Sequence, residues 1–489
     1  MVALIPLGYL VVRSFERGFG TVWQVLWRDR TAELAVRSLL LACAVTAACV
    51  VIGVFGAWLV VRSDLPARRL VAVLLVLPLA VPSYVSGFTW IAELPWLSGF
   101  GGAFVVLTLV SFPYVLLPVA AALRSADPAM EEVARSLGKT RWQTFVLVTL
   151  RQIRPAATAG GLLVALYALS DFGAVSLMRF EAFTMGIYTS YRATFDRTPA
   201  AILGCVLVIL ALALTVGERR ARGAWTARSA KTAGRVVAVV PLGKARVPAV
   251  LAVIALVVLS LGVPVYSLVR WLVIGSSAGV DMDALLAATW GTVTVSALGA
   301  LFALVLAVPV GVYVVRHRGR LARGVELASF AGHALPGITV GLALVFFAVR
   351  VVPGLYQRMP VLAFAYAVLF LPLAVSAVRT AVANAPPVLE DVARSLGKGR
   401  AATRALVTIP LAAPGVVTGA ALVFLTCAKE LPATLLLRPT GTDTLATELW
   451  SKTEVGAFAA AAPYAAVLLV VAALPALVLD RFLHKGGMR

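Results

Sequence analysis

Long runs of apolar residues, separated by short polar segments, dominate the chain. A helix needs roughly 20 apolar residues to cross the hydrocarbon core of a bilayer, and most of these runs reach that length. The pattern predicts an all-α polytopic membrane protein with about twelve transmembrane helices. We place them near residues 1–13, 36–61, 70–92, 101–123, 156–178, 199–217, 248–274, 289–315, 325–349, 359–378, 411–437 and 459–481. The first run is too short to cross a bilayer unaided.

The two halves of the chain repeat each other at a nearly constant offset. The segment EEVARSLGKTR at 131–141 returns as EDVARSLGKGR at 390–400, with nine of eleven positions identical. Ala174 pairs with Ala433 at the same offset, and so does Arg179 with Arg438. A repeat of this length indicates a duplicated unit. Each unit has six predicted spans, an even number, so the two sets are expected to be parallel rather than inverted.

This duplication divides the chain into six expected segments. They are a partial first span with an extracytoplasmic loop (1–35), a first transmembrane domain (36–217), a basic cytoplasmic linker (218–247), the first span and loop of the second repeat (248–286), a second transmembrane domain (287–482) and a basic cytoplasmic tail (483–489).

Composition supports a membrane protein and argues against other classes. Of the 489 residues 61% are hydrophobic and 13% charged, and the mean hydropathy is +0.96, far outside the range of soluble domains. The net charge of +21 does not indicate a nucleic-acid partner, because no basic soluble domain with interleaved aromatic residues is present. The four cysteines and three histidines lack metal-ligand spacing, so neither a metal site nor a cofactor is expected. No cleavable signal peptide is evident at the N-terminus.

The basic segments predict the orientation. The linker 218–247 has a net charge of +7, and both the loop 315–324 and the C-terminal tail are basic, whereas residues 275–288 have a net charge of −2. In the twelve-span arrangement the basic segments share one side, which should therefore be cytoplasmic. Both termini and both copies of the repeated polar segment are then expected in the cytoplasm.

The repeated polar segment has the pattern of a short amphipathic helix ended by a glycine. Asp127 and Pro128 form a helix start, with Asp127 as the N-cap. Four residues of each copy follow a helical spacing on one apolar face: Met130, Val133, Ala134 and Leu137, and Leu389, Val392, Ala393 and Leu396. The opposite face of the first copy is polar, with Glu131, Glu132, Arg135 and Ser136. Gly138 and Gly397 stand where a left-handed residue would end the helix.

Such a helix could lie on lipid headgroups or dock into a groove of a protein. Helices that bind lipid headgroups favour lysine and arginine on the polar face, whereas this face carries both signs of charge. A small apolar ridge with polar rims suits a protein groove. Two equivalent helices then indicate a partner with two equivalent sockets, such as a cytoplasmic dimer.

At this point a family resemblance becomes specific. The pattern Glu-x-Ala-x-x-x-Gly before the fifth span resembles the EAA coupling loop of binding-protein-dependent ABC importer permeases. The first copy matches at Glu132, Ala134 and Gly138, and the second at Asp391, Ala393 and Gly397, with aspartate replacing the usual glutamate. The family loop often ends in Leu-Pro or Ile-Pro, which Ile409-Pro410 matches and Leu150-Arg151 does not.

The resemblance covers essentially the whole chain as two fused permease units and carries expectations beyond the motif. It implies a type I ABC importer permease fold in the bacterial inner membrane, fed by an extracytoplasmic substrate-binding protein. It also implies that a cytoplasmic ATPase, expected as a homodimer, binds the two loops. The coupling-loop residues would be Glu131, Glu132, Ala134, Gly138, Glu390, Asp391, Ala393 and Gly397.

Two further segments suggest the transported species. KELPATLLLRPTGTDTLATELW (429–450) and SDFGAVSLMRF (170–180) resemble the corresponding segments of ferric iron import permeases, which also fuse two units in one chain. Permeases for thiamine, polyamines or phosphonates share the coupling loop and are the alternatives. The resemblance therefore favours ferric iron as the substrate.

Asp171 and Glu430 align across the repeat and fall well inside the predicted fifth spans. Acidic residues at that depth are costly and are candidates for a transport pathway, here one favouring a cation. Alternatively, Asp171 caps a helix break beside Gly173, and Glu430 neutralises Lys429 or a neighbouring helix. Both readings stay open at this level.

The chain is not expected to hydrolyse ATP. Gly138-Lys139-Thr140 resembles the end of a phosphate-binding loop, but Val133 occupies the position of its first glycine and no strand precedes it. Two other classes remain as rivals: a twelve-span secondary transporter with parallel halves, and a membrane scaffold without transport. Neither gives a reason for two coupling loops at equivalent positions.

Overall fold

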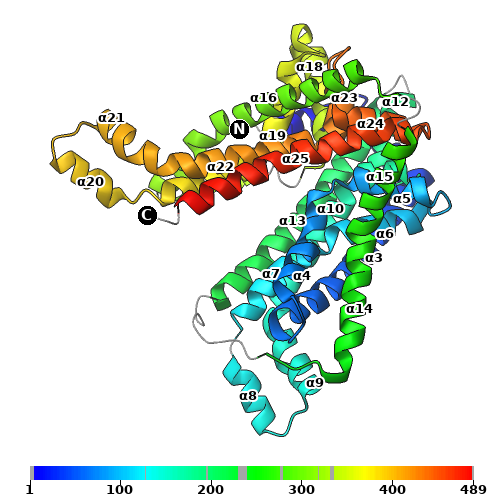
Figure 1. The fold of residues 1–489 in the computed structure, drawn as a ribbon. Coiled ribbons are helices and arrows are strands. Elements are labelled where there is room, and N and C mark those ends of the chain that lie inside the picture. Colours follow the sequence, from blue (N-terminus) through cyan, green and yellow to red (C-terminus); the bar gives the residue numbers. More distant parts are fainter. Residues whose placement is uncertain are drawn as a thin grey trace. The chain divides into compact units, whose positions relative to one another are not determined.

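The computed structural model describes residues 5–126, 128–193, 197–229, 239–275, 279–317, 319–330 and 335–486. Within these ranges nearly all regular structure is helical, and the sole β feature is one isolated bridge between Ser63 and Val240. The chain forms two compact units, whose helices Figure 1 labels. The first unit gathers the described residues of Met1–Leu26, Ile187–Val208 and Ile274–Arg489, and the second those of Trp27–Gly186 and Ile209–Val273.

The first unit contains most of the second repeat together with the N-terminal helices of the chain. Its helices are α1 (Ile5–Phe15), α2 (Phe19–Leu26), α16 (Met282–Arg316), α17 (Arg320–Phe330), α18 (Gly337–Val351), η8 (Pro353–Leu355), α19 (Met359–Ala383), α20 (Pro387–Ser395), α21 (Arg400–Thr403), η9 (Arg404–Thr408), α22 (Ile409–Ala428), α23 (Pro432–Leu437), α24 (Leu445–Glu454) and α25 (Phe458–Gly486).

The second unit contains most of the first repeat together with the first span of the second repeat. Its helices are α3 (Asp29–Arg62), α4 (Arg68–Val76), η2 (Leu77–Ala80), α5 (Ser83–Glu93), α6 (Gly99–Ser111), α7 (Pro113–Arg124), α8 (Pro128–Ser136), α9 (Arg141–Thr144), η3 (Phe145–Thr149), α10 (Leu150–Ser170), α11 (Gly173–Leu177), η4 (Gly243–Ala245), α14 (Arg246–Val257), η5 (Val258–Gly262) and α15 (Val263–Gly275). Both α12 (Phe183–Ala193) and α13 (Thr198–Ser229) contribute residues to each unit.

The compact units therefore interleave the two repeats. In the first unit, Tyr9 of α1 packs edge-on against Phe347 of α18 at 5.7 Å between ring centroids, and Arg350 pairs with Glu16. In the second unit, Ser267 of α15 donates a 3.2 Å hydrogen bond to the Thr89 carbonyl of α5. Each repeat thus lends its first helix to the body that holds the rest of the other repeat.

The predicted polytopic all-α architecture is confirmed. Eight helices in the described ranges are long and apolar enough to cross a membrane, and a ninth candidate is the pair 68–80 and 83–93, bent by 93°. Three shorter apolar helices lie at 5–15, 337–351 and 458–472. Each of these twelve segments overlaps one of the twelve predicted spans, although several boundaries differ.

Small residues let the long helices of each unit approach closely. A Cβ atom added at Gly53 of α3 would lie 2.7 Å from the Val115 Cβ of α7, and one added at Gly160 of α10 would lie 2.8 Å from the Tyr114 carbonyl oxygen. In the first unit, Gly415 of α22 faces Ala381 of α19 in the same way. Close backbone contact at small residues is typical of helix packing in membranes.

Several predicted boundaries are wrong. The expected spans 156–178 and 411–437 end earlier, because α10 stops at Ser170 and α22 stops at Ala428. The expected span 70–92 is not continuous, because it bends between η2 and α5. The helix expected at 199–217 continues to Ser229, into the expected linker. Apolar composition continues across each of these points, so hydropathy alone could not locate the breaks.

Candidate functional site

The two copies of the repeated segment form matching helices, α8 and α20, at the ends of their units (Figure 1). The predicted glycine turns are confirmed: Gly138 has φ +78° and Gly397 has φ +81°, a backbone conformation that other residues adopt only with strain. The expected N-cap Asp127 lies outside the described residues. In the second copy the N-cap is Pro386.

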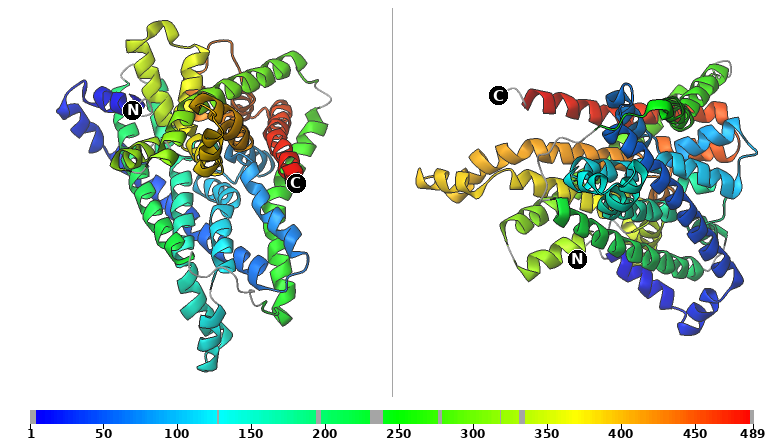
Figure 2. Two further views of the ribbon diagram at one scale, coloured as in Figure 1. Left: turned by 90° about the vertical axis from the view of Figure 1, so that its left-hand side faces the viewer. Right: turned by 90° about the horizontal axis from the view of Figure 1, so that it is seen from below.

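One apolar face of each helix is uncovered within the chain. Leu137 is 73% exposed and Leu396 is 75% exposed, and the other large apolar residues of these faces, Met130, Val133, Val388, Leu389 and Val392, are also exposed. The right-hand view of Figure 2 shows α20 and α21 at the far end of the helices of their unit. Exposed apolar clusters of this kind mark interaction sites.

The polar face of α8 is attached to two other helices. Glu131 Oε1 accepts a 2.8 Å hydrogen bond from the Thr149 hydroxyl at the end of η3. Arg62, the last residue of α3, donates from Nη1 to Glu131 Oε2 at 3.4 Å, and its Nη2 lies 3.3 Å from Oε1. The Arg62 side chain is 3% exposed and that of Glu131 is 12% exposed, so solvent screens this ion pair little.

The second repeat builds the same contact from the same residue types. Glu390 of α20 accepts a 2.6 Å hydrogen bond from the Thr408 hydroxyl at the end of η9. Arg316, the last residue of α16, pairs with the same Glu390 oxygen. We call Arg62–Glu131–Thr149 and Arg316–Glu390–Thr408 the two surface-helix links.

The acids that match the family motif lie elsewhere on these helices. Glu132 and Asp391 are exposed, and Asp391 pairs with Arg394 one turn along α20. Ala134 and Ala393 are partly buried. The two acids of each EE or ED pair therefore differ in role, since the first is anchored and the second faces solvent.

The arginine and threonine of each link were not predicted from the sequence, in which Glu131 stood out only as part of the polar face of the helix. The sequence does contain a clue in the repeat, because Thr149 matches Thr408 at an offset of 259 and Arg62 matches Arg316 at an offset of 254. The motif alone could not reveal this contact, because Arg62 and Thr149 stand 69 and 18 positions from Glu131 in the sequence.

Each link ends on a helix of unusual winding. Both η3 and η9 are π-helical turns of five residues, at equivalent places between the short helix after the glycine turn and the long fifth span. Single π-helical turns inside α-helices are rare and occur frequently at functional sites. In the second unit a small cavity of about 50 Å³ adjoins this turn, lined by Arg62, Glu131 and Thr149 among others.

The candidate pathway acids do not lie inside the fifth helices as predicted. Asp171 is the residue directly after α10, and its Oδ1 accepts hydrogen bonds from the backbone N–H groups of Ala174, at 2.8 Å, and Val175. Its Oδ2 accepts a hydrogen bond from the Ser83 hydroxyl at the start of α5. Asp171 thus caps the helix break, as the alternative interpretation expected, and ties it to the bend of the third span.

Glu430 occupies the equivalent break between α22 and α23. Its Oε1 accepts a 3.1 Å hydrogen bond from the Ala433 N–H. Gly337, the first residue of α18, stands where Ser83 stands in the other repeat, and a Cβ there would overlap the Glu430 carboxylate. We call Ser83–Asp171 and Gly337–Glu430 the two acid junctions. A serine faces the shorter acid and a glycine faces the longer one.

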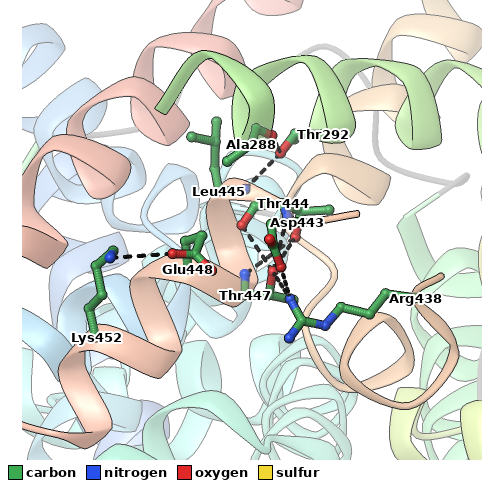
Figure 3. Close-up of polar contacts among 9 residues, drawn as sticks. All are labelled: Ala288, Thr292, Arg438, Asp443, Thr444, Leu445, Thr447, Glu448 and Lys452. Atoms are coloured by element: carbon green, nitrogen blue, oxygen red, sulfur yellow. Dashed lines mark hydrogen bonds and ion pairs between the residues drawn. The ribbon is translucent and has the colours of Figure 1, made fainter. Parts of the chain in front are cut away.

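The loop beyond the second acid junction is held by a polar network (Figure 3). Arg438, after α23, pairs with Asp443 and donates a 3.3 Å hydrogen bond to Thr447. The Leu445 N–H donates to the Thr292 hydroxyl of α16 at 2.8 Å, and Figure 3 shows this contact at the start of α24. In the first repeat the Phe183 N–H makes the matching 2.8 Å hydrogen bond to the Ser38 hydroxyl of α3.

No group of three or more His, Cys, Asp or Glu side chains that could hold a metal ion occurs among the residues that the structure describes. Asp171 belongs to the second unit and Glu430 to the first, so each is described with its own neighbours.

Comparison with known proteins now identifies the class. The sequence pattern of the family described as "Binding-protein-dependent transport system inner membrane component" matches residues 49–220 and 299–485, once in each repeat. The chain belongs to this family. It is therefore a transport subunit of the inner membrane, and the family works with ATPase and binding-protein partners.

Individual members of the family differ in how much of this chain they match. The chain is 35% identical over 486 residues to the Fe(3+)-transport system permease protein FbpB 2 of Haemophilus influenzae, covering 98% of this chain and 96% of that protein. It is 29% identical over 236 residues to the sulfate transport system permease protein CysT of Escherichia coli, covering 44% of this chain and 84% of that protein. The sulfate permease CysW of the same organism is 30% identical over 192 residues, which is 36% of this chain and 66% of that protein.

Proposed function

We propose that this chain forms the translocation pathway of an ABC importer for ferric iron. The observation that carries the proposal is the similarity to the Fe(3+)-transport permease, which spans both repeats and nearly the full length of both proteins. The similarity to the sulfate permeases extends over less than half of the chain. Resemblance of residues 170–180 and 429–450 to ferric permeases supports the same substrate.

In this proposal α8 and α20 dock onto a cytoplasmic ATPase homodimer. Their uncovered apolar faces and matching glycine turns suit two equivalent sockets. Glu131, Glu132, Ala134 and Gly138, with Glu390, Asp391, Ala393 and Gly397, form the two coupling loops. Both termini are then cytoplasmic, which the positively charged linker supports. An extracytoplasmic binding protein delivers the substrate on the opposite side.

Asp171 and Glu430 are the proposed acidic residues of the pathway. Each stands at a break between two helices, the kind of discontinuity that forms substrate sites in many membrane transporters. A carboxylate favours a trivalent cation and disfavours sulfate, which agrees with the full-length relative. Their capping hydrogen bonds hold the carboxylates in position and are compatible with this role.

Reconstitution into proteoliposomes tests the proposal. The chain should co-purify with its ATPase and, with the binding protein present, should take up radiolabelled ferric iron in a vanadate-sensitive reaction that excess sulfate does not inhibit. Iron uptake that persists without the ATPase and collapses with an ionophore would contradict it. If sulfate or thiamine inhibited the uptake, the proposed substrate would be wrong, but the assignment as an ABC importer permease would stand.

A further inference from the structure

The two surface-helix links join parts of the chain that the main-chain connections leave separate. Along the chain, α8 is tied to α7 before it and, through a glycine turn, to α9 after it. The side chain of Glu131 adds a contact to the end of α3 and another to the end of η3. Glu390 adds the equivalent contacts to α16 and η9.

We propose that these links transmit movement of α8 and α20 into the second and fifth spans of each repeat simultaneously. This inference rests on the proposed function, because it assumes an ATPase that moves the two helices. Glu131 and Glu390 are then positioning residues, which act through the spans and do not contact the substrate.

The burial of the links supports a mechanical role. An exposed ion pair on a helix surface contributes little and exchanges readily with water. The Arg62–Glu131 pair is almost fully buried, and Arg316 and Glu390 are each 20% exposed. A threonine hydroxyl satisfies a further lone pair of each carboxylate. A buried, multiply bonded carboxylate resists displacement, so that α8 cannot move without its neighbours.

Each link ends where the long helix of the fifth span begins. Thr149 and Thr408 are the last residues of the π-helical turns, which lead directly into the long helices of the fifth spans. From there α10 runs 21 residues and α22 runs 20 residues, roughly 30 Å each, to the breaks at Asp171 and Glu430. A displacement applied at the π-helical turn therefore reaches the acid junction along one continuous helix.

The neighbouring acids provide an internal contrast. Glu132 and Asp391 are exposed, and within the described residues neither forms a hydrogen bond or ion pair with α3, α16 or the π-helical turns. Glu131 and Glu390, in contrast, are held by an arginine and a threonine each. Docking and transmission thus use different residues of the same helix.

The test uses the complete transporter in proteoliposomes and compares E131Q/E390Q with wild type. Glutamine keeps the size of the side chain and removes the charge that holds the arginine. We expect co-purification of the ATPase to be unchanged and ATP hydrolysis to continue, while uptake per ATP hydrolysed falls at least about fivefold, as expected for a lost coupling interaction. The control is E326Q, which removes the Arg379–Glu326 ion pair between α17 and α19 and should leave this ratio unchanged.

A second pair of variants keeps the test decisive if the glutamine variants do not insert. T149V/T408V removes the hydroxyl groups and should lower uptake per ATP in the same direction, whereas T149S/T408S should restore it. An unchanged ratio in the variants that insert would overturn the inference. Loss of ATPase co-purification would also overturn it, because the glutamates would then belong to the docking surface. If the wild-type chain itself binds no ATPase, the proposed function fails instead.

Discussion

The two surface-helix links use the same residues in both repeats, whereas the two acid junctions do not. Arginine, glutamate and threonine recur at the links, at 62, 131 and 149 and again at 316, 390 and 408. At the junctions, Ser83 and Asp171 of one repeat are replaced by Gly337 and Glu430 of the other. Both regions descend from one duplicated unit, so the difference arose after duplication.

The contrast agrees with the proposed binding partner of each region, which is the ATPase for the surface helices and the substrate for the acid junctions. Two equivalent sockets of a homodimer require two equivalent surface helices, held in the same way. A single substrate in a single pathway requires no such symmetry, and the two acids are free to differ in reach. The two junctions nevertheless share a size rule: the longer acid is paired with the smaller neighbour, so that the total side-chain volume stays similar.

The largest effect is expected from breaking the symmetric region at its turns. In G138P/G397P, proline fixes φ near −65° where the chain needs about +80°, and it removes the Gly138 N–H that bonds to Arg135 at 2.9 Å. We expect a cost above about 1.4 kcal/mol per turn, which corresponds to a more than tenfold loss of uptake.

The control for this variant is G138N/G397N. Asparagine tolerates the left-handed conformation, and nothing lies within 4 Å of a Cβ at either position. It should keep most of the uptake, as measured in proteoliposomes. Full activity in the proline variant would show that the turns do not position the docking faces.

An intermediate effect is expected from exchanging the composition of the junctions. G337S alone places a side chain on the Glu430 carboxylate and should cost about 1–3 kcal/mol through overpacking. Adding E430D shortens the acid and reproduces the pair found in the first repeat, so G337S/E430D should be more stable than G337S. Thermal unfolding of the purified chain measures the interaction energy, expected at about 0.5–3 kcal/mol.

Additive effects of the two changes would contradict the size rule. Uptake should be measured on the same variants. A double variant that is stable but inactive would show that transport needs the longer side chain of Glu430, independently of how the junction packs.

A smaller effect is expected where the repeats keep a contact but change the residue. Ser38 and Thr292 both accept a backbone N–H at 2.8 Å, from Phe183 and Leu445 respectively. T292V leaves the buried Leu445 N–H without its acceptor and should destabilise by about 1–3 kcal/mol, whereas T292S should be close to wild type. T289V, one turn away, removes only a local bond to Leu285 and serves as the control. Equal melting temperatures for T292V and T289V would show that this contact is dispensable.

Sequence pattern predicted the apolar spans and the glycine turns because each depends on neighbouring residues, and it predicted the repeat because the two halves can be compared directly. Hydrophobic length determines which segments can cross a bilayer, and the left-handed position after α8 favours glycine through its backbone conformation alone. The apolar faces of α8 and α20 also follow from helical spacing, and the structure shows that their large apolar residues are exposed.

The acid positions were predicted less well. Residues 172–178 continue the apolar run of α10, so a hydropathy pattern extends the span through Asp171, although the helix ends before it. The bend before Ser83 and the break after Ser170 depend on each other, because the Ser83 hydroxyl donates a hydrogen bond to the Asp171 carboxylate 88 positions away.

The sequence by itself thus determined that the protein is a duplicated, all-helical membrane protein with two exposed surface helices. Only the tertiary structure decided which acid of each surface helix is anchored, where the fifth spans end, and that each compact unit takes its first helix from the other repeat. The physical reason is the range of the interactions. Helix length, amphipathic spacing and glycine turns depend on neighbours along the chain, whereas ion pairs and helix packing depend on groups that folding brings together from distant positions.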